Sequence, residues 1–222
     1  VLGLPGGVSP GVPEAKRDEI RALADDAIAF GEFSLELFHD VVLGNERYVE
    51  LITGDAYRDE THYMGLVDER GRAAFYDGRL RVVKPDGSPH AQFDAADYHR
   101  HIGEHVEDWT YIKFPFLRDP GWRGFEEGPD SGVYRVAPLA RLNAADGMAT
   151  PRAQAEYEKM YEVLGGKPTP FTLANHWARL VELVSAAERM REIADDPELT
   201  SDRIRNMDLG TPDEGVGVIE AP

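Results

Sequence analysis

The stretch Val133–Asn143, which reads VYRVAPLARLN, joins the two halves of this sequence and decides how they are connected. It is apolar, has a proline in its middle and carries Arg135 and Arg141. Its apolar residues follow neither a helical spacing nor the alternation of a half-buried strand, so we predict a buried, irregular segment. A buried guanidinium without a partner is costly. At least one of the two arginines should therefore pair with a carboxylate inside the domain.

Outside this stretch, much of the sequence has apolar residues at helical spacing. Apolar side chains that recur every three or four residues predict amphipathic helices, and glycine pairs such as Gly165-Gly166 predict where one ends. In the first predicted helix, the side chains of Phe30, Phe33 and Phe38 are expected in the core. The predicted helices are Pro13–Val42, Asp94–Trp109, Arg152–Leu164 and Pro170–Ala194.

Residues 62–94 have a different pattern, with short strand-like runs between turn signals. The pairs Asp77-Gly78 and Asp86-Gly87 are the strongest hairpin signals. Together with the helices, this pattern predicts an α+β fold in which long helices pack with a small antiparallel β meander, as one domain over residues 1–222. The strand-like runs are Met64–Val67, Ala73–Tyr76, Leu80–Val83 and Gln92–Phe93.

The composition narrows the classes of function. A net charge of −17 over 222 residues argues against a nucleic-acid partner, whose phosphates would be repelled. No apolar run reaches the length of about 18 residues that a membrane span needs, so we expect no membrane partner. The sequence has no cysteine, which excludes a disulfide, a thiolate metal site and a cysteine nucleophile within this stretch.

Few residues in the sequence carry a signal for chemistry. His101 and His105 stand at i,i+4 in a predicted helix, a spacing that can chelate a metal. No carboxylate occupies a metalloprotease-like position between them, which favours a solvated helix face instead. Neither a phosphate-binding glycine loop nor a serine nucleophile elbow is present, so we assign no catalytic residue and no metal ligand.

Four motifs nevertheless occur in a familiar order, and with them the sequence resembles the middle part of the large (alpha) subunit of [NiFe]-hydrogenases. Its VIEAP wording is more similar to the soluble branch, whose partners use NAD(P) or a deazaflavin. One departure is Ala137, which stands where the family has glycine. The motifs are PGGVS at Pro5–Ser9, WTYIKFP at Trp109–Pro115, YRVAPLARLN at Tyr134–Asn143 and EGVGVIEAP at Glu214–Pro222.

The resemblance implies a nickel-dependent oxidoreductase that splits H2 at a Ni-Fe centre held by cysteine thiolates. The two Cys-x-x-Cys motifs of such a subunit would lie outside this stretch, which begins without a methionine. We therefore expect a fragment that acts as scaffold, holds no cofactor and is inactive as an isolated chain. Its expected partners are the remainder of the large subunit, together with an iron-sulfur small subunit, in the cytoplasm. Apolar faces exposed by excision could also lead to self-association.

The resemblance also names residues that would support a metal site from outside its ligand shell. These candidates are Gly6, Gly7, Lys113, Arg141 and Glu220. A second interpretation fits the absence of cysteine and the acidic surface equally well: a stand-alone, cofactor-free homologue that serves as an interaction or assembly domain. Whether the chain is itself an enzyme is left open by both interpretations.

Overall fold

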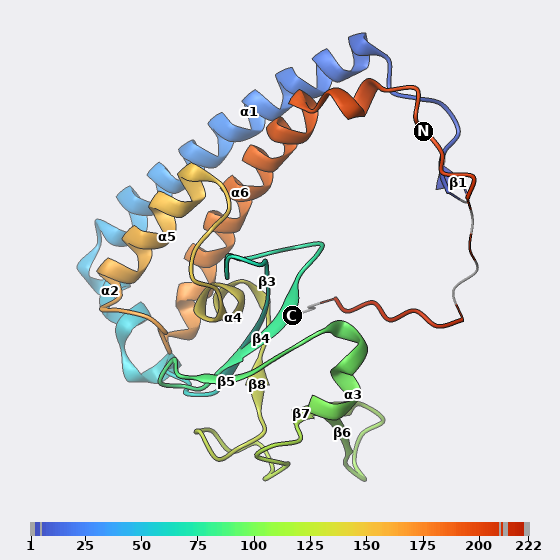
Figure 1. Ribbon diagram of the computed structural model, residues 1–222. Helices are drawn as coiled ribbons and strands as arrows, with labels where there is room; N and C mark the ends of the chain where they lie inside the picture. Colours follow the sequence, from blue (N-terminus) through green and yellow to red (C-terminus); the bar gives the residue numbers. More distant parts are fainter. Residues whose placement is uncertain (1–2, 5, 209, 211–212, 220–222) are drawn as a thin grey trace.

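The computed structural model describes residues 3–4, 6–208, 210 and 213–219. A layer of long helices lies beside a small β-sheet and a separate β-hairpin (Figure 1), which confirms the predicted α+β fold. The α-helices are α1 (Glu14–Phe38), α2 (Glu46–Thr53), α3 (Tyr98–His101), α4 (Ala137–Ala144), α5 (Pro151–Val163) and α6 (Asn175–Asp195). The strands are β1 (Gly3–Leu4), β2 (Gly7–Val8), β3 (His62–Val67), β4 (Arg79–Val83), β5 (Pro89–Phe93), β6 (Ile102–Val106), β7 (Lys113–Leu117) and β8 (Tyr134–Arg135).

Helices α1, α5 and α6 form the helical layer, and α6 runs antiparallel to α1 (Figure 1). An ion pair of 2.8 Å between Arg21 and Asp195 joins the start of α1 to the end of α6. Midway along the two helices, a Cβ added to Gly31 would lie 3.1 Å from a methyl carbon of Val184, so the helices approach closely there. Three of the four predicted helices are thereby confirmed, with ends that differ by a few residues.

The expectation that Phe30 and Phe33 lie in the core is wrong. Their side chains are 60% and 55% exposed. Phe38, by contrast, packs on Trp177 with ring centroids 5.3 Å apart. Apolar residues occur around more than one face of α1, so their spacing predicts a helix correctly without identifying the face that is covered.

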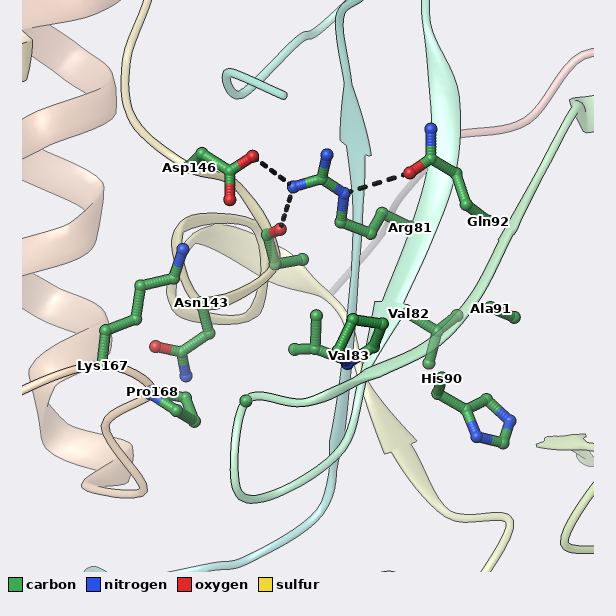
Figure 2. A pocket seen from close by; sticks show the side chains of 13 residues that line it. Arg81, Val82, Val83, His90, Ala91, Gln92, Asn143, Asp146, Lys167 and Pro168 are labelled. Atoms are coloured by element: carbon green, nitrogen blue, oxygen red, sulfur yellow. Dashed lines mark hydrogen bonds and ion pairs between the residues drawn. The ribbon is translucent and has the colours of Figure 1, made fainter. Parts of the chain in front are cut away.

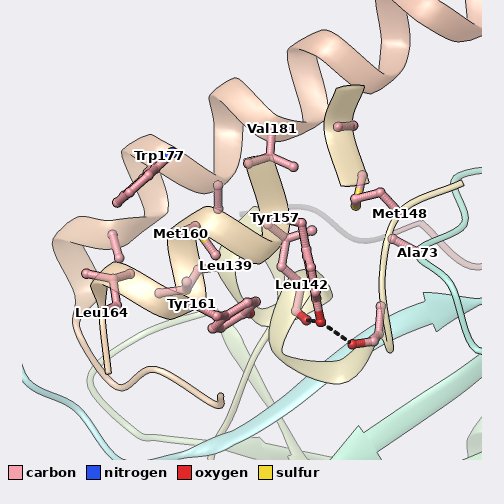
Figure 3. Packing of buried hydrophobic residues seen from close by; sticks show 14 of the residues in the cluster. Ala73, Leu139, Leu142, Met148, Tyr157, Met160, Tyr161, Leu164, Trp177 and Val181 are labelled. Carbon is pink, nitrogen blue, oxygen red and sulfur yellow. Dashed lines mark hydrogen bonds between the residues drawn. The ribbon is translucent and has the colours of Figure 1, made fainter. Parts of the chain in front are cut away.

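The main hydrophobic core lies between α4, α5 and α6 (Figure 3). Leu142, Met160 and Val181 are fully buried in it. The buried Tyr157 donates its hydroxyl hydrogen to the carbonyl of Ala145 at 2.9 Å, which satisfies the polar end of an otherwise apolar contact. The core thus joins a short helix from the middle of the chain to two long helices that follow it.

The meander prediction is largely confirmed. The four-stranded sheet has the order β5-β4-β3-β8, in which β3, β4 and β5 are antiparallel neighbours and β8 lies parallel to β3. Asp86-Gly87 forms the β4–β5 turn, where Gly87 has φ of +82°. The run Ala73–Tyr76 is not a strand: it forms one isolated bridge, between Ala73 and Val67, within the β3–β4 connection.

The predicted helix Asp94–Trp109 is wrong beyond its first two turns. A 3₁₀ turn and the four-residue α3 end at His101, and β6 then pairs with β7 as a hairpin. Pairing with a partner strand that lies further along the chain decides this conformation, and it overrides local propensity. His101 and His105 are consequently not on one helical face. His101 stacks on Phe93 with ring centroids 4.0 Å apart, and His105 stacks on Trp122 with ring centroids 4.5 Å apart.

The stretch Val133–Asn143 is half-buried over residues 133–136 and largely buried from Ala137 onward, so the burial prediction holds in part, and it is not irregular. Tyr134 and Arg135 form β8, and Ala137–Ala144 forms α4, which is buried along nearly its whole length. Pro138 stands in the first turn of α4, where a missing N–H leaves no hydrogen bond unmade. Ala137 adopts φ of +80°, a left-handed conformation that favours glycine. The chain thereby turns sharply from strand into helix.

Two leucine substitutions test which helix faces form the core. We expect Leu142→Ala to lower the free energy of unfolding by about 2–5 kcal/mol, because it leaves a cavity among α4, α5 and α6. The matched variant Leu23→Ala, at a side chain that is 61% exposed on α1, should change it by less than about 0.5 kcal/mol. Urea titration followed by circular dichroism measures both, and equal losses would contradict this assignment of the core.

His62 gives a second prediction, on pH dependence. The ring is fully buried on β3, neither of its nitrogen atoms has a hydrogen-bond partner among the described residues, and the His90 ring lies 4.9 Å away. Burial, with the nearby charges of His90 and Lys84, lowers the pKa of His62 to about 4. The unfolded chain therefore binds the proton first, and stability present above pH 6.5 is lost as the pH falls toward 4.

The variant His62→Leu should remove this loss. Between pH 6.5 and 4, its free energy of unfolding should fall by about 2 kcal/mol less than that of the unmodified chain. His176→Leu, at an exposed histidine of α6, is the matched control and should follow the unmodified chain. Chemical denaturation at a series of pH values measures the difference, and parallel curves for His62→Leu and the unmodified chain would refute the prediction.

Candidate functional site

Arg141 lies where three segments of the chain meet. The backbone of helix α4 packs directly against β3 at Gly65, where an added Cβ would lie only 2.7 Å from the Cα atom of Arg141. The Arg141 guanidinium then extends toward α6. Its position is set by backbone contact on one side and by a charged partner on the other.

That partner is Glu182 of α6. The Nε and Nη2 atoms of Arg141 donate to the two carboxylate oxygens at 2.7 Å and 3.2 Å, a two-point geometry, and both side chains are about one-eighth exposed. The guanidinium carbon also lies 5.2 Å from the centre of the Phe75 ring. The sequence-based expectation of a carboxylate partner is therefore confirmed for Arg141.

Arg135 also has its expected partner. Its guanidinium forms an ion pair with Asp59 and donates to the Thr172 hydroxyl at 2.7 Å. Burial raises the pKa of Asp59, and the charge of Arg135 opposes this rise. The two arginines of Val133–Asn143 thus connect the segment to chain parts before and after it.

A small cleft of about 220 Å³ lies beside Arg141. Val218 and Ile219 form part of the cleft wall, so the described end of the chain meets the segment Val133–Asn143 here. The candidate Glu220 follows directly but lies outside the described residues. The described residues that line the cleft are Leu66, Ala74, Phe75, Leu80, Arg141, Val218 and Ile219.

The other candidates from the sequence are not brought to this cleft. Lys113 stands on β7, largely exposed, and donates to Glu104 of β6 at 2.8 Å. Gly6 and Gly7 lie against residues 204–206: the Gly6 carbonyl accepts from Asn206 at 2.7 Å, and a Cβ on Gly7 would overlap the Ile204 carbonyl. Figure 1 places β1 and β7 on different parts of the molecule. The five candidates therefore do not form one site.

The chemistry available at Arg141 is limited to charge and position. An arginine stays protonated in proteins, so it can hold a neighbouring group in place but does not exchange protons. Within the described part of the chain, no three His, Cys, Asp or Glu side chains are grouped so that they could hold a metal ion. No helix in that part has the length and apolar character needed to cross a membrane.

Comparisons with known proteins concern the chain as a whole. No family model matches the sequence. The chain is 46% identical to the iron-sulfur subunit of the F420-non-reducing hydrogenase of Archaeoglobus profundus, over all of this chain and 46% of that protein. It is 39% identical to a vhu subunit of the F420-non-reducing hydrogenase of Methanococcus voltae, again over the whole chain and over 50% of the relative.

Two further similarities point the same way. The chain is 34% identical to the beta subunit of the NAD-reducing hydrogenase HoxS of Cupriavidus necator, over all of this chain and 45% of that protein. A crystal structure described as NAD+-reducing [NiFe]-hydrogenase in the H2-reduced state superposes with a TM-score of 0.78 and 29% identity, over 91% of this chain and 43% of the other. The chain spans about half the length of the curated relatives it matches.

These names correct the resemblance drawn from the motifs. One matched relative is called an iron-sulfur subunit, and another is called a beta subunit, so the assignment to a nickel-dependent large (alpha) subunit is wrong. An expected Ni-Fe centre in the parent is likewise not supported. The matched relatives are hydrogenase subunits, in line with the resemblance, but the motifs do not by themselves identify the subunit.

A double-mutant experiment tests the role of the ion pair beneath the cleft. Arg141→Met should lower the free energy of unfolding by about 3 kcal/mol, because it leaves the Glu182 carboxylate poorly solvated and unpaired. Adding Glu182→Leu should recover at least half of this loss, since two apolar side chains can replace a buried pair. Urea denaturation of both single variants and the double variant gives the coupling energy. Strictly additive losses would show that the two side chains act independently.

Proposed function

We propose that this chain is a structural portion of a hydrogenase subunit, and that the assembled enzyme oxidises H2 or reduces protons. The similarity to the iron-sulfur subunit of an F420-non-reducing hydrogenase, which extends over the whole chain at 46% identity, carries this proposal. On this view residues 1–222 act together as one domain and do not turn over H2 as an isolated chain. The absence of cysteine supports this view, because this stretch offers no thiolate that could hold an iron-sulfur cluster.

The proposed role of the chain is to form a rigid support. Arg141 is held from two sides and lines the cleft into which the C-terminal segment runs. We assign it a positioning role at that segment, and Glu220 stays a further candidate for such a role. Gly6, Gly7 and Lys113 would serve other contacts, since their surroundings differ.

The proposed partners are the rest of the same subunit, with an iron-sulfur protein of the enzyme. Several large apolar side chains are exposed at the turn of the β6–β7 hairpin: Trp109 is 71% exposed and Tyr111 is 96% exposed. Exposed aromatic side chains of this kind are common in protein–protein contacts. We expect the isolated chain to self-associate through such faces. We also propose that the assembled enzyme is cytoplasmic.

A chimeric enzyme tests the proposal. The segment of the Archaeoglobus profundus iron-sulfur subunit that matches this chain is replaced by residues 1–222, and the complex is purified with its native partner subunits. We expect H2-dependent viologen reduction by the chimera at a tenth or more of the native rate, because every part of the segment has a counterpart. The isolated chain should give no reduction above the blank.

The corresponding segment of the Methanococcus voltae vhu subunit, which is also a hydrogenase segment, provides the matched control chimera. If that control is active while the chimera carrying residues 1–222 assembles without activity, the proposal that this chain is a portion of such a hydrogenase subunit is wrong. H2-dependent reduction by the isolated chain would contradict the proposed inactivity.

A further inference from the structure

A larger cavity shares no lining residue with the cleft at Arg141. It has a volume of about 660 Å³ and opens between the β4–β5 hairpin and two segments near residues 143–146 and 167–168 (Figure 2). Val82, Val83 and Ala91 form its apolar wall. One end is closed where Gly87 meets Pro168, since an added Cβ on Gly87 would lie 2.7 Å from the proline ring.

Arg81 and Asp146, which both line this cavity, form an ion pair with each other. Arg81 of β4 donates through Nη1 to Asp146 at 2.8 Å and to the Ala144 carbonyl at 3.3 Å, while its Nε donates to the Gln92 side chain at 3.3 Å. Asp146 is fixed by its own N–H, which donates to the Gly71 carbonyl at 2.7 Å. The Arg81 and Asp146 charges therefore offset each other.

Lys167 is the charge that remains without an opposite partner. Its ammonium group donates to the Ala145 carbonyl and lies 5.8 Å from the centre of the Tyr157 ring. The charges that act on this nitrogen are those of Asp146 and Arg81, which are already paired with each other. Desolvation by the surrounding residues, reinforced by the charge of Arg81, lowers the pKa of Lys167 to about 8, although Asp146 opposes the change. The side chain is still exposed to solvent, so an anion can reach the ammonium and is attracted by its charge.

Other groups at the cavity add donors. Figure 2 shows the nitrogen atoms of Lys167 and Arg81 toward the same end of the cavity, where Asp146 lies. The Gln92 oxygen is used by Arg81, which leaves its amide N–H groups as donors, and the His90 ring lines the opposite end. In a chain of net charge −17, a cavity with two cations and one already paired carboxylate is a local exception.

We propose that this cavity binds a small oxyanion, a sulfate, phosphate or carboxylate group, through the ammonium of Lys167 with Arg81 and Gln92 beside it. Carbonyl and ring contacts hold Lys167 in place before the ligand arrives, so little side-chain freedom is lost on binding. The apolar wall of valines and Ala91 suits a ligand with a short hydrocarbon part next to its charged group. This site is separate from the cleft at Arg141, and it does not depend on the proposed function.

Calorimetric titration of the chain with sodium sulfate and, separately, sodium acetate tests the proposal, with ionic strength held constant by chloride. We expect saturable binding of at least one of the two anions. Lys167→Gln should weaken it at least tenfold, while Lys16→Gln, at an exposed lysine of α1, should leave the affinity within twofold. The two salts distinguish a tetrahedral anion from a carboxylate.

The pH dependence and a labelling experiment add independent outcomes. Sulfate keeps its charge between pH 6 and 10, so its affinity should fall as the pH rises through the lysine's titration near 8. In the unmodified chain, bound anion should slow acetylation of Lys167 at least threefold without changing that of Lys16, as read by mass spectrometry. This measurement uses only the unmodified chain, so it does not depend on whether a variant folds. Absence of saturable binding by either salt, or equal binding by Lys167→Gln, would overturn the proposal.

Discussion

The close contact between α4 and β3 at Gly65 is the constraint on which the rest of the structure depends. A side chain at this position would overlap the backbone of Arg141, so only glycine lets the helix lie directly on the strand. Helix α4 is eight residues long and buried on nearly all sides, and its other contacts reach α5 and α6. The Arg141–Glu182 pair then fixes the rotation of α4 against α6. Sheet and helical layer are thereby joined through one short element.

How well the fold could be predicted depended on the length and pattern of each element. The long helices α1 and α6 are identified correctly because many apolar positions repeat the same spacing. Helix α4 was missed because eight residues buried on every side show no polar face, and periodicity cannot identify such a segment. The segment after His101 was misassigned for another reason: β6 forms a hairpin with β7, a strand beyond the predicted helix, so the pattern within residues 94–109 does not contain this pairing.

The site was predictable only in part, for the same physical reasons. Charge and burial together required partners for Arg135 and Arg141, and both have them. The sequence did not indicate how far apart the motif residues Gly7 and Lys113 lie in space. In the structure they lie on different parts of the molecule. The Lys167 cavity was not foreseen, since its walls come from the hairpin β4–β5 and two later segments that no spacing rule connects.

The antiparallel pairing of α1 with α6 has a consequence for how the chain acquires its structure during synthesis. The ion pair between Asp25 and Arg191 joins residues 166 positions apart. Helix α1 leaves the ribosome before α6, and at a usual rate of about 5–20 residues per second the helix that covers it follows roughly ten seconds or more later. Throughout that interval both apolar sides of α1 face solvent. Chaperone demand and aggregation of the nascent chain should therefore be governed by the sequence of α1, although its mature outer face contributes little to stability.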